Sequence, residues 1–581
     1  MSLQKIYRQS ESSVHVPEGD GYYVELVSFK RENTMKLYDA VYLYRQSWSF
    51  TRRQYCTGDG RLQTGHLIEK IRGEEFMPIF WTDFHSNIHH DQMKDLEKWI
   101  EQIRQTLDFW PIAYYPFGMR KDSTGLGVED TIPMESIKVD WEVLRKAVDK
   151  VNEEGFPMFM GYEWQGNGLD GDHNVFFKTN KEDPCFVLDY HKLIENYADT
   201  EAIGIPHHTA YQLKNRGKDW DRQNDTFSPF AEVYSSHGSS ECDDNWINMD
   251  RHVHMGPRTD ATSVSTGLKK GNRFGLIASG DNHSCPGVYG FGYAAVVAKD
   301  NSKEEIWKAL RSRHVYGVSK DRMDVDFKID DAIMGDVVSA GKRTMHLHVE
   351  GMDTIDRIEI LKNEKRIHLI SGPEEEVASE NGTVRYKFFI EAGWGPDLRV
   401  FPDITEKVWK GMIKTPGKIL SVTPCFSTFG QSVDKQTENE LDFTFTTHST
   451  TATGKWMGPS AVTTEGLQVE IEDTLDSYLD IEMEGKRVHL SVQELLQGTH
   501  VYAMEEEVKQ LLKERYGFTE YYRSDPFWHN AYKFRVHKAS LSSWYTQDVD
   551  MEMDLQPGDE IRCKIMEKNG SCAWTSPIFV D

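Results

Sequence analysis

The feature that most constrains the fold is an alternation of apolar, strand-like runs with amphipathic helical segments between about residue 76 and residue 320. The run MPIFWTDFH precedes HDQMKDLEKWIEQIRQTLD, and LDFWPIAYYP precedes VDWEVLRKAVDKVNEEGF; both second segments have apolar residues at helical spacing. Further strand-like runs are FPMFMGYEW, AIGIPHH, FAEVYSS and FGLIASGDNH. SKEEIWKALRSRH is a last helix, with Ser302 and Glu305 as a capping box. This alternation predicts a parallel sheet that closes into an α/β barrel, with an open doubly wound sheet as the alternative.

The flanking regions lack this alternation. The N-terminal runs GYYVELVSF and AVYLYRQSWSF are rich in β-branched and aromatic residues, and RIEILKNEKRIHLI and EIRCKIMEKNGSCAWTSPIFV alternate like strands. One helix is expected near MEEEVKQLLKERYG. We therefore predict an N-terminal β-rich elaboration (1–75), an α/β barrel (76–324), a β-sandwich domain (325–435) and a C-terminal β-rich domain (436–581).

Charge and cysteine content limit the partners that we expect. The formal net charge of −26 argues against nucleic acid or an anionic membrane as a partner, because phosphates would be repelled. No apolar run has the length of a membrane span or of a signal peptide core. The seven cysteines are scattered without a CxxC pair, which favours a cytoplasmic location. The sequence leaves the oligomeric state open.

Side chains that ligate metals gather where the predicted strands end. They are Asp83, His85, Asn87, His89, His90 and Asp91; Glu163 and His173; His207 and His208; Glu232 and His237; and Asp281 and His283. Carboxylates and neutral imidazoles suit Zn, Mn and Fe. Because neighbouring side chains of a strand point apart, we expect at most one histidine of each adjacent pair to bind an ion.

The order of these groups resembles the PHP superfamily, named for polymerase and histidinol phosphatase, over residues 76–320. SGDNHSCPGVYGFG, EEIWKALRSRHVYGVSKDRMDVDF and the terminal AWTSPIFV resemble a bacterial branch known only as a domain of unknown function. The resemblance implies a distorted (β/α)7 TIM-like barrel of PHP type, C-terminal β domains, bound Zn, Mn or Fe and, in most characterised members, phosphoester hydrolysis.

The resemblance also implies metal ligands. They are His85, the bridging Glu163, His173 with one of His207 and His208, and the closing Asp281 and His283, with His90 or Asp91 beside His283 at a third ion. Two departures stand out: Asn87 replaces the second histidine of the family's His-x-His, and Ala113-Tyr114-Tyr115 replaces its Thr-Asp-His. Since an amide is a poorer ligand than an imidazole, we predict one or two divalent ions rather than three.

The favoured function is a metal-dependent hydrolase of a small or carbohydrate-linked phosphoester, related in chemistry to amidohydrolases. His237, Tyr115 or His283 would protonate the leaving group, and Arg120, Lys121 or Arg216 would bind the phosphate. Two alternatives remain. The same site could cleave an amide, a lactone or a glycan ester. The chain could also be a non-catalytic glycan- or protein-binding scaffold with a degenerate metal site.

Overall fold

The computed structural model describes residues 51–56, 62–67, 77–121, 127–247, 249, 256–377, 382–394, 402–448, 464–517 and 532–581. The predicted N-terminal elaboration therefore lies mostly outside the described residues. Within it, β1 (Thr51–Cys56) and β2 (Leu62–Leu67) form an antiparallel pair, close to β24 and to helix α2 respectively.

Two sheets carry the predicted strand ends. The first has the order β10 (Ala202–His207), β9 (Asp172–Phe177), β8 (Met158–Trp164), β5 (Trp110–Tyr115), β4 (Asn87–His89). Strands β4, β5 and β8 are parallel, whereas β9 is antiparallel to both neighbours. The second sheet has the order β12 (Gly238–Ser239), β11 (Phe230–Ser235), β13 (Gly275–Ala278), and β11 and β13 are parallel.

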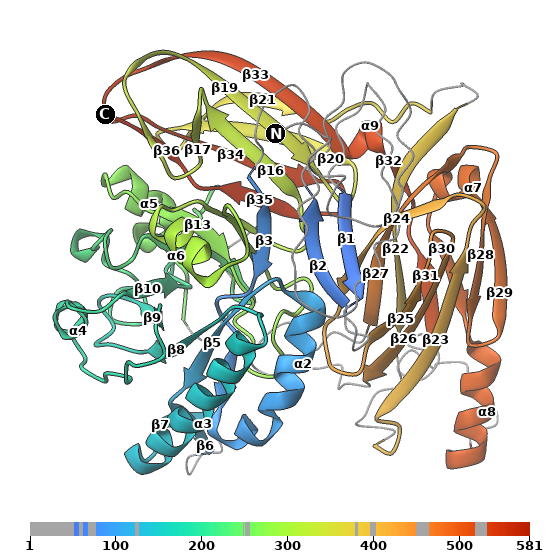
Figure 1. Cartoon of the computed structure of the whole chain (residues 1–581), viewed down its shortest axis with the longest axis horizontal. Coiled ribbons are helices and arrows are strands. Elements are labelled where there is room, and N and C mark those ends of the chain that lie inside the picture. Colours follow the sequence, from blue (N-terminus) through green and yellow to red (C-terminus); the bar gives the residue numbers. More distant parts are fainter. Residues whose placement is uncertain are drawn as a thin grey trace, which may run out of the picture.

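The amphipathic segments form the expected helices (Figure 1). Residues His90–Asp95 are a 3-10 turn, η1, and α2 (Leu96–Thr106) then buries Leu96, Trp99 and Ile103. The hairpin of β6 (Phe117–Lys121) and β7 (Gly127–Thr131) leads into α3 (Met134–Glu153). The remaining helices of this region are α4 (Tyr190–Asn196), α5 (Val264–Lys269) and α6 (Lys303–Arg311). The Ser302 hydroxyl accepts from the amide of Glu305, so Ser302 is the N-cap of α6 and one half of the predicted capping box is confirmed.

The mixed α/β class is confirmed, but a closed barrel of parallel strands is not shown. The predicted first strand, β3 (Ile79–Thr82), pairs antiparallel with β14 (Tyr293–Val297) in another sheet. The strands nevertheless enclose one interior of buried apolar side chains, among them Phe84, Phe109, Phe159, Phe176, Ile203, Phe230, Ile277 and, from α6, Trp307. A bridge between Ser86 and Asn282 joins the edge of the first sheet to the end of β13.

The last strands of the chain return to the α/β region. One sheet has the order β18 (Val337–Val338), β36 (Ile578–Val580), β34 (Glu560–Glu567), β35 (Cys572–Thr575), β15 (Val315–Val318), β14, β3, and β20 (Ile355–Lys362) and β21 (Lys365–Ser371) extend it from β34. A four-stranded sheet beside it has the order β17 (Ala332–Ile333), β16 (Asp324–Ile329), β19 (Gly341–Glu350), β33 (Thr546–Leu555). Strands from both ends of the chain thus build one layer (Figure 1).

A second β region lies beyond this layer. One sheet has the order β24 (Lys418–Cys425), β27 (Thr464–Thr474), β22 (Thr383–Gly393), β31 (Lys533–Val536), β30 (His500–Ala503), with β32 (Ser540–Leu541) on β22. The other has the order β25 (Ser432–Gln436), β26 (Glu440–His448), β23 (Glu406–Lys414), β28 (Tyr478–Met483), β29 (Lys486–Ser491). Helices α7 (Val492–Gln497), α8 (Glu505–Tyr516) and α9 (Ser542–Tyr545) accompany them, and α8 confirms the helix predicted near residue 510.

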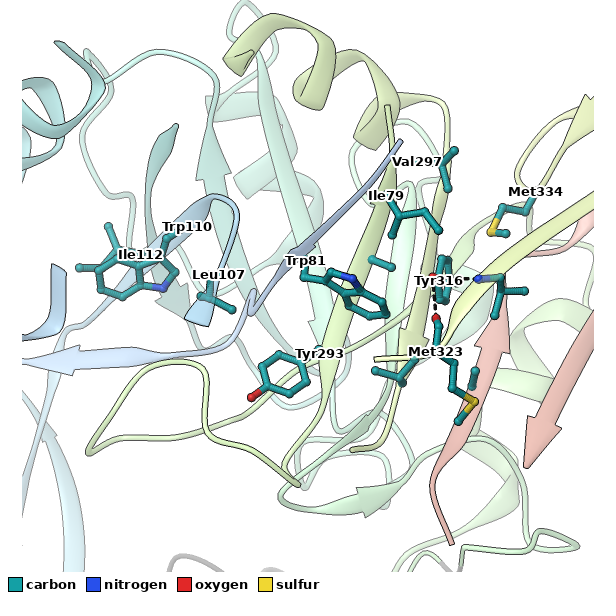
Figure 2. Packing of buried hydrophobic residues seen from close by; sticks show 14 of the residues in the cluster. Ile79, Trp81, Leu107, Trp110, Ile112, Tyr293, Val297, Tyr316, Met323 and Met334 are labelled. Atoms are coloured by element: carbon teal, nitrogen blue, oxygen red, sulfur yellow. Dashed lines mark hydrogen bonds between the residues drawn. The ribbon is translucent and has the colours of Figure 1, made fainter. Parts of the chain in front are cut away.

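The hydrophobic core crosses the predicted boundary at 324/325. Trp81 of β3 packs edge-on against Tyr316 of β15, and Met323 belongs to the same cluster (Figure 2). The cluster continues to Ile358 and Ile565. A separate cluster that includes Trp409, Phe443 and Val469 fills the second β region. The strand pairings also run across 435/436, since β24 pairs with β27 and β19 with β33. The three domain boundaries remain predictions.

Within the described residues, no helix has the length and apolar character needed to cross a membrane.

Candidate metal centre

Seven buried side chains at or near the ends of several strands form a continuous group, here called the strand-end cluster: His85, Glu163, Asp172, His207, His208, His237 and Asp281. Three overlapping sets within it have ligand atoms within 4.8 Å of one another. They are His85–Glu163–His207, Asp172–His207–His208 and His208–His237–Asp281. Because His207 and His208 each belong to two sets, the three sets form one connected arrangement.

His85 lies among three carboxylates. Its Nδ1 is 2.9 Å from Glu232 Oε2, and its Nε2 is 3.2 Å from Asp281 Oδ1 and 3.7 Å from Glu163 Oε2. Burial opposes protonation, but the charges of Asp281 and Glu232 outweigh it and raise the pKa of His85 well above its usual value. Without an ion, a proton on His85 therefore compensates part of the negative charge here.

Both histidines of the 207–208 pair belong to the cluster, although we expected at most one of them to bind an ion; which of them does so stays a prediction. Strand β10 ends at His207, and His208 has a left-handed backbone with φ of 36°. The alternation of side chains therefore stops after His207, and both rings reach the same group. The ring centroids are 4.4 Å apart. Burial is the main cause that lowers the pKa of each imidazole. Repulsion from His85 lowers the pKa of His207 further, and repulsion from His237 does the same to the pKa of His208.

Asp281 and His237 complete the third set. His237 Nε2 is 2.7 Å from Asp281 Oδ2, and the ring's Nδ1 is hydrogen-bonded to the Tyr211 hydroxyl at 2.7 Å. Asp281 has a φ of 49°, a conformation that residues other than glycine adopt infrequently. Burial opposes ionisation of Asp281, but His85 and His237 outweigh it and lower the pKa of this carboxyl well below its usual value. Asp281 is thus held as a carboxylate between two imidazoles.

Asp172 is the cluster member that the sequence did not identify. Strand β9 is antiparallel to β8 and β10, so its first residue, not its last, lies at the site, where Asp172 pairs with His207 in register. The predicted ligand His173 is not a member of the three sets. Its ring packs 4.9 Å from Tyr190 and 5.6 Å from Trp164, and Nδ1 is 3.3 Å from the carbonyl of Gly171.

Two further predicted ligands lie outside the strand-end cluster. His90 Nδ1 is 2.6 Å from Asp140 Oδ2, which also accepts a hydrogen bond from the Tyr114 hydroxyl at 2.6 Å. Asp91 is exposed. Because β4 ends at His89 and the chain turns into η1, these two side chains are directed away from the strand ends. Asp83 is also outside the cluster, and its carboxylate accepts hydrogen bonds from the backbone amides of His85, Gly280 and Gly287.

Asn87, Tyr115 and His283 border the cluster. The Asn87 amide donates to Glu163 Oε2 at 2.6 Å, so it orients this carboxylate. Gln165 Nε2 donates to Glu163 Oε1 at 3.0 Å and to the Tyr115 hydroxyl at 3.2 Å. His283 Nε2 is 3.4 Å from Asp281 Oδ1, and its Nδ1 is 2.6 Å from His89 Nε2. The Tyr115 and His283 rings are in contact, with centroids 4.7 Å apart.

Several ring nitrogens of the cluster have no hydrogen-bond partner within the described part of the chain. They are both nitrogens of His207, Nδ1 of His208 and Nε2 of His85. A buried polar atom without a partner is costly, and native proteins satisfy most of them. Imidazole nitrogens beside carboxylates are the donor set that Zn, Mn and Fe bind, so the residues fit a divalent ion.

Comparison with known proteins gives limited further information. A family model described as a protein of unknown function, DUF3604, matches residues 235–351, which include SGDNHSCPGVYGFG. A Chlamydia pneumoniae protein described as uncharacterised is 27% identical over 251 residues, 39% of this chain and 40% of the relative. An uncharacterised Chlamydia trachomatis protein is 28% identical over 267 residues, 42% of each chain. The matches thus span about two fifths of these relatives.

One solved structure is similar to this chain, with a low TM-score. It is a Bacteroides vulgatus protein described as a two-domain protein containing a predicted PHP-like metal-dependent phosphoesterase. It has 11% sequence identity and a TM-score of 0.28, and the match covers 71% of this chain and 95% of that one.

Proposed function

We propose that the protein is a metal-dependent hydrolase and that phosphoesters are its preferred substrates. The observation that carries the proposal is the strand-end cluster, in which overlapping sets of buried imidazoles and carboxylates include ring nitrogens without partners. The carboxylates of Glu163, Asp172 and Asp281 lie within the cluster, and that of Glu232 lies beside it. A divalent cation would therefore offset the repulsion among these four carboxylates.

The donor sets suggest two ion sites. His85, Glu163 and His207 would hold one ion; His208, His237 and Asp281 would hold the other, with Asp172 between them. A bound divalent ion stabilises negative charge on an ester oxygen and provides a nucleophilic water near neutral pH. His173, His90 and Asp91 have no place in this assignment, and His237 becomes a ligand rather than the proton donor of the sequence prediction.

The residues that border the cluster handle protons and orientation in this proposal. His283 would protonate the leaving group from Nε2, the nitrogen that faces Asp281, while Nδ1 exchanges its proton with His89. Gln165 would keep Glu163 and the Tyr115 hydroxyl in fixed positions through its two hydrogen bonds. Tyr115 would then orient the substrate beside His283.

Arg216 supports a negatively charged substrate. Its Nη1 donates to Asp172 Oδ2 at 2.6 Å, and His208 Nε2 is 3.8 Å from the same oxygen. The Arg216 side chain is 27% exposed, whereas Asp172 is buried, so the guanidinium extends from solvent to the cluster. A cation placed there attracts a phosphoryl group and contributes nothing comparable to a neutral ester.

The fold that we propose around this site is a distorted, incomplete barrel of PHP type. The shared aromatic interior and the Ser86–Asn282 bridge support it, because they connect the two strand-end sheets on the inside and at one edge. A cytoplasmic location likewise remains our proposal.

The first test is metal content, measured by inductively coupled plasma mass spectrometry on full-length protein purified without chelator or tag. We expect about one to two equivalents of Zn, Mn or Fe per chain. Glu163→Ala should lose at least the ion held by His85, Glu163 and His207, while His90→Ala, at a histidine outside the cluster, should keep the wild-type metal content. Less than about a tenth of an equivalent after incubation with each ion would refute the metal site and favour a non-catalytic scaffold.

The second test concerns the bond that is cleaved. The metal-loaded protein is assayed with p-nitrophenyl phosphate, bis(p-nitrophenyl) phosphate and the neutral p-nitrophenyl acetate. We expect Arg216→Gln to lower kcat/KM for the phosphomonoester by about 10- to 100-fold and to leave the neutral ester nearly unchanged. Arg222→Gln is the matched control, because Arg222 is equally exposed but pairs with Asp170 and Asp189. Turnover of the neutral ester alone would point to the alternative ester, lactone or amide hydrolase.

A further inference from the structure

The loop that carries His237 is connected to the end of the chain by buried charges. Glu241, four residues after His237, binds Arg562 Nη2 at 2.8 Å through Oε1 and Lys564 Nζ at 2.7 Å through Oε2. Trp574 Nε1 also donates to Glu241 Oε2 at 2.8 Å. Arg562 pairs in addition with Glu364 at 2.6 Å. We call Glu241, Glu364, Arg562 and Lys564 the C-terminal clamp.

The same loop is fixed on its other side by the site itself. The Ser236 amide donates to the carbonyl of Gly280 at 3.2 Å, and the Ser236 hydroxyl donates to the carbonyl of Asp281 at 3.2 Å. Arg258 donates from Nη1 to the carbonyl of His237 at 2.8 Å and from Nη2 to that of Ser239 at 3.0 Å. The backbone from 235 to 241 is therefore held between Asp281 at one end and the clamp at the other.

Apolar packing places the C-terminal strands directly behind this loop. Tyr234 of β11 stacks on Trp574 of β35, with centroids 5.8 Å apart. Their cluster also contains Val233 of β11, Leu276 of β13 and Met566 of β34. The sheet that presents His237 and Asp281 thus rests on strands that the chain contributes some 300 residues later.

A buried ion network has a particular use at such a contact. Two buried charges bring little net stability compared with apolar side chains of the same size, because the cost of desolvation offsets their attraction. Their bonds do, however, define one register between the two elements, whereas apolar side chains tolerate several. Apolar side chains would therefore stabilise this contact as well as Glu241, Arg562 and Lys564 do, so stability alone does not explain the three charges.

We propose that strands β34 and β35 position His237 through Glu241, so that the set His208–His237–Asp281 binds its ion only when the C-terminal clamp is formed. This inference rests on the proposed metal site. It gives the C-terminal β region a role in assembling the site, and Glu241 is a positioning residue that does not itself contact the ion.

The test compares Glu241→Gln with Arg385→Met in the full-length chain. Arg385 belongs to another buried network, with Glu470 and Glu350, on strands remote from the clamp, so its loss lowers stability without touching the His237 loop. Zn²⁺ stoichiometry and affinity are measured by competition with a chromogenic chelator. Hydrogen exchange of peptides covering 235–241 is followed by mass spectrometry on the metal-free protein.

We expect Glu241→Gln to weaken one of the two ions by about 10- to 100-fold and to speed exchange at 235–241, while peptides around 203–208 keep their rates. Arg385→Met should bind both ions as the wild type does, and Lys564→Arg, which retains the charge opposite Glu241, should keep most of the wild-type affinity. Equal weakening by Glu241→Gln and Arg385→Met would overturn the inference, as would unchanged exchange and affinity in Glu241→Gln. Ion binding without ester hydrolysis would refute only the proposed function.

Discussion

The strand-end cluster and the C-terminal clamp are both buried groups of ionisable side chains, yet they are satisfied in opposite ways. In the clamp, each carboxylate has a cation as its partner: Glu241 faces Arg562 and Lys564, and Glu364 faces Arg562. In the strand-end cluster, carboxylates face imidazoles, and both nitrogens of His207 lack a partner within the described residues. The clamp carboxylates are thus paired with cations of the protein itself, although Arg562 Nη1 has no hydrogen-bond partner among the described residues. The strand-end cluster instead combines carboxylates with open imidazole nitrogens, which is the donor set of a cation site.

Breaking the clamp should have the largest effect on stability. Arg562→Met leaves Glu241 and Glu364 buried with fewer partners, and we expect the free energy of unfolding to fall by about 3–5 kcal/mol. Urea unfolding followed by tryptophan fluorescence measures this. A loss below about 1 kcal/mol would mean that the clamp carboxylates find water or other donors when Arg562 is removed.

An ion should stabilise the strand-end cluster by a smaller amount. At free Zn²⁺ about 100-fold above its dissociation constant, binding to the native state adds about 2.7 kcal/mol to the free energy of unfolding. The melting temperature of chelator-treated protein with and without Zn²⁺ measures this. His207→Gln should remove the part of the increase that comes from the ion held by His85, Glu163 and His207, and His90→Gln should retain the whole increase. An increase of the same size in His207→Gln would place the ion elsewhere.

The two groups should lose stability in different pH windows in the metal-free protein. Burial lowers the pKa of His207 and His208 below the 6.5 of the unfolded chain, so their contribution is present above about pH 6.5 and is lost as the pH falls below it. At Glu241, burial opposes ionisation, but Lys564 and Arg562 outweigh it and hold the pKa at about 2. That contribution is present above about pH 4.5 and is lost as the pH falls towards 2.

Urea unfolding at a series of pH values separates these windows. His207→Gln should flatten the dependence below pH 6.5, and Glu241→Gln should flatten it only below pH 4.5. A common shift of both windows by either variant would contradict the independence of the two groups.

An exposed ion pair should show the smallest effect. Arg487 and Glu482 lie 2.9 Å apart on neighbouring strands, but the Arg487 side chain is 83% exposed. Solvent screens such pairs, so we expect Arg487→Gln to leave the urea midpoint unchanged within error. A shift comparable to that of Arg562→Met would show that burial is not what distinguishes the clamp.

Much of the secondary structure was predictable because its signals are local. The spacing of Leu96, Ile100 and Ile103 predicted α2, and the run FPMFMGYEW became a fully buried β8. Strand pairing was less predictable, since it depends on contacts between distant segments. The alternation of elements predicted a parallel sheet and did not identify β9, whose antiparallel direction brings Asp172 beside His207. His173 was named as a ligand from the resemblance alone.

The sequence by itself determined the types of side chain at the strand ends, the helices between the strands and the β-rich character of the C-terminal half, because residue chemistry and short-range periodicity are properties of neighbours in the chain. Only the tertiary structure decided which of these side chains meet. Three backbone features decide which candidate ligands belong to the cluster. The left-handed backbone at His208 and the direction of β9 bring His208 and Asp172 into it, and the turn at His90 takes His90 out of it. The clamp between Glu241 and β34 joins residues more than 300 positions apart, and no local pattern encodes such a contact.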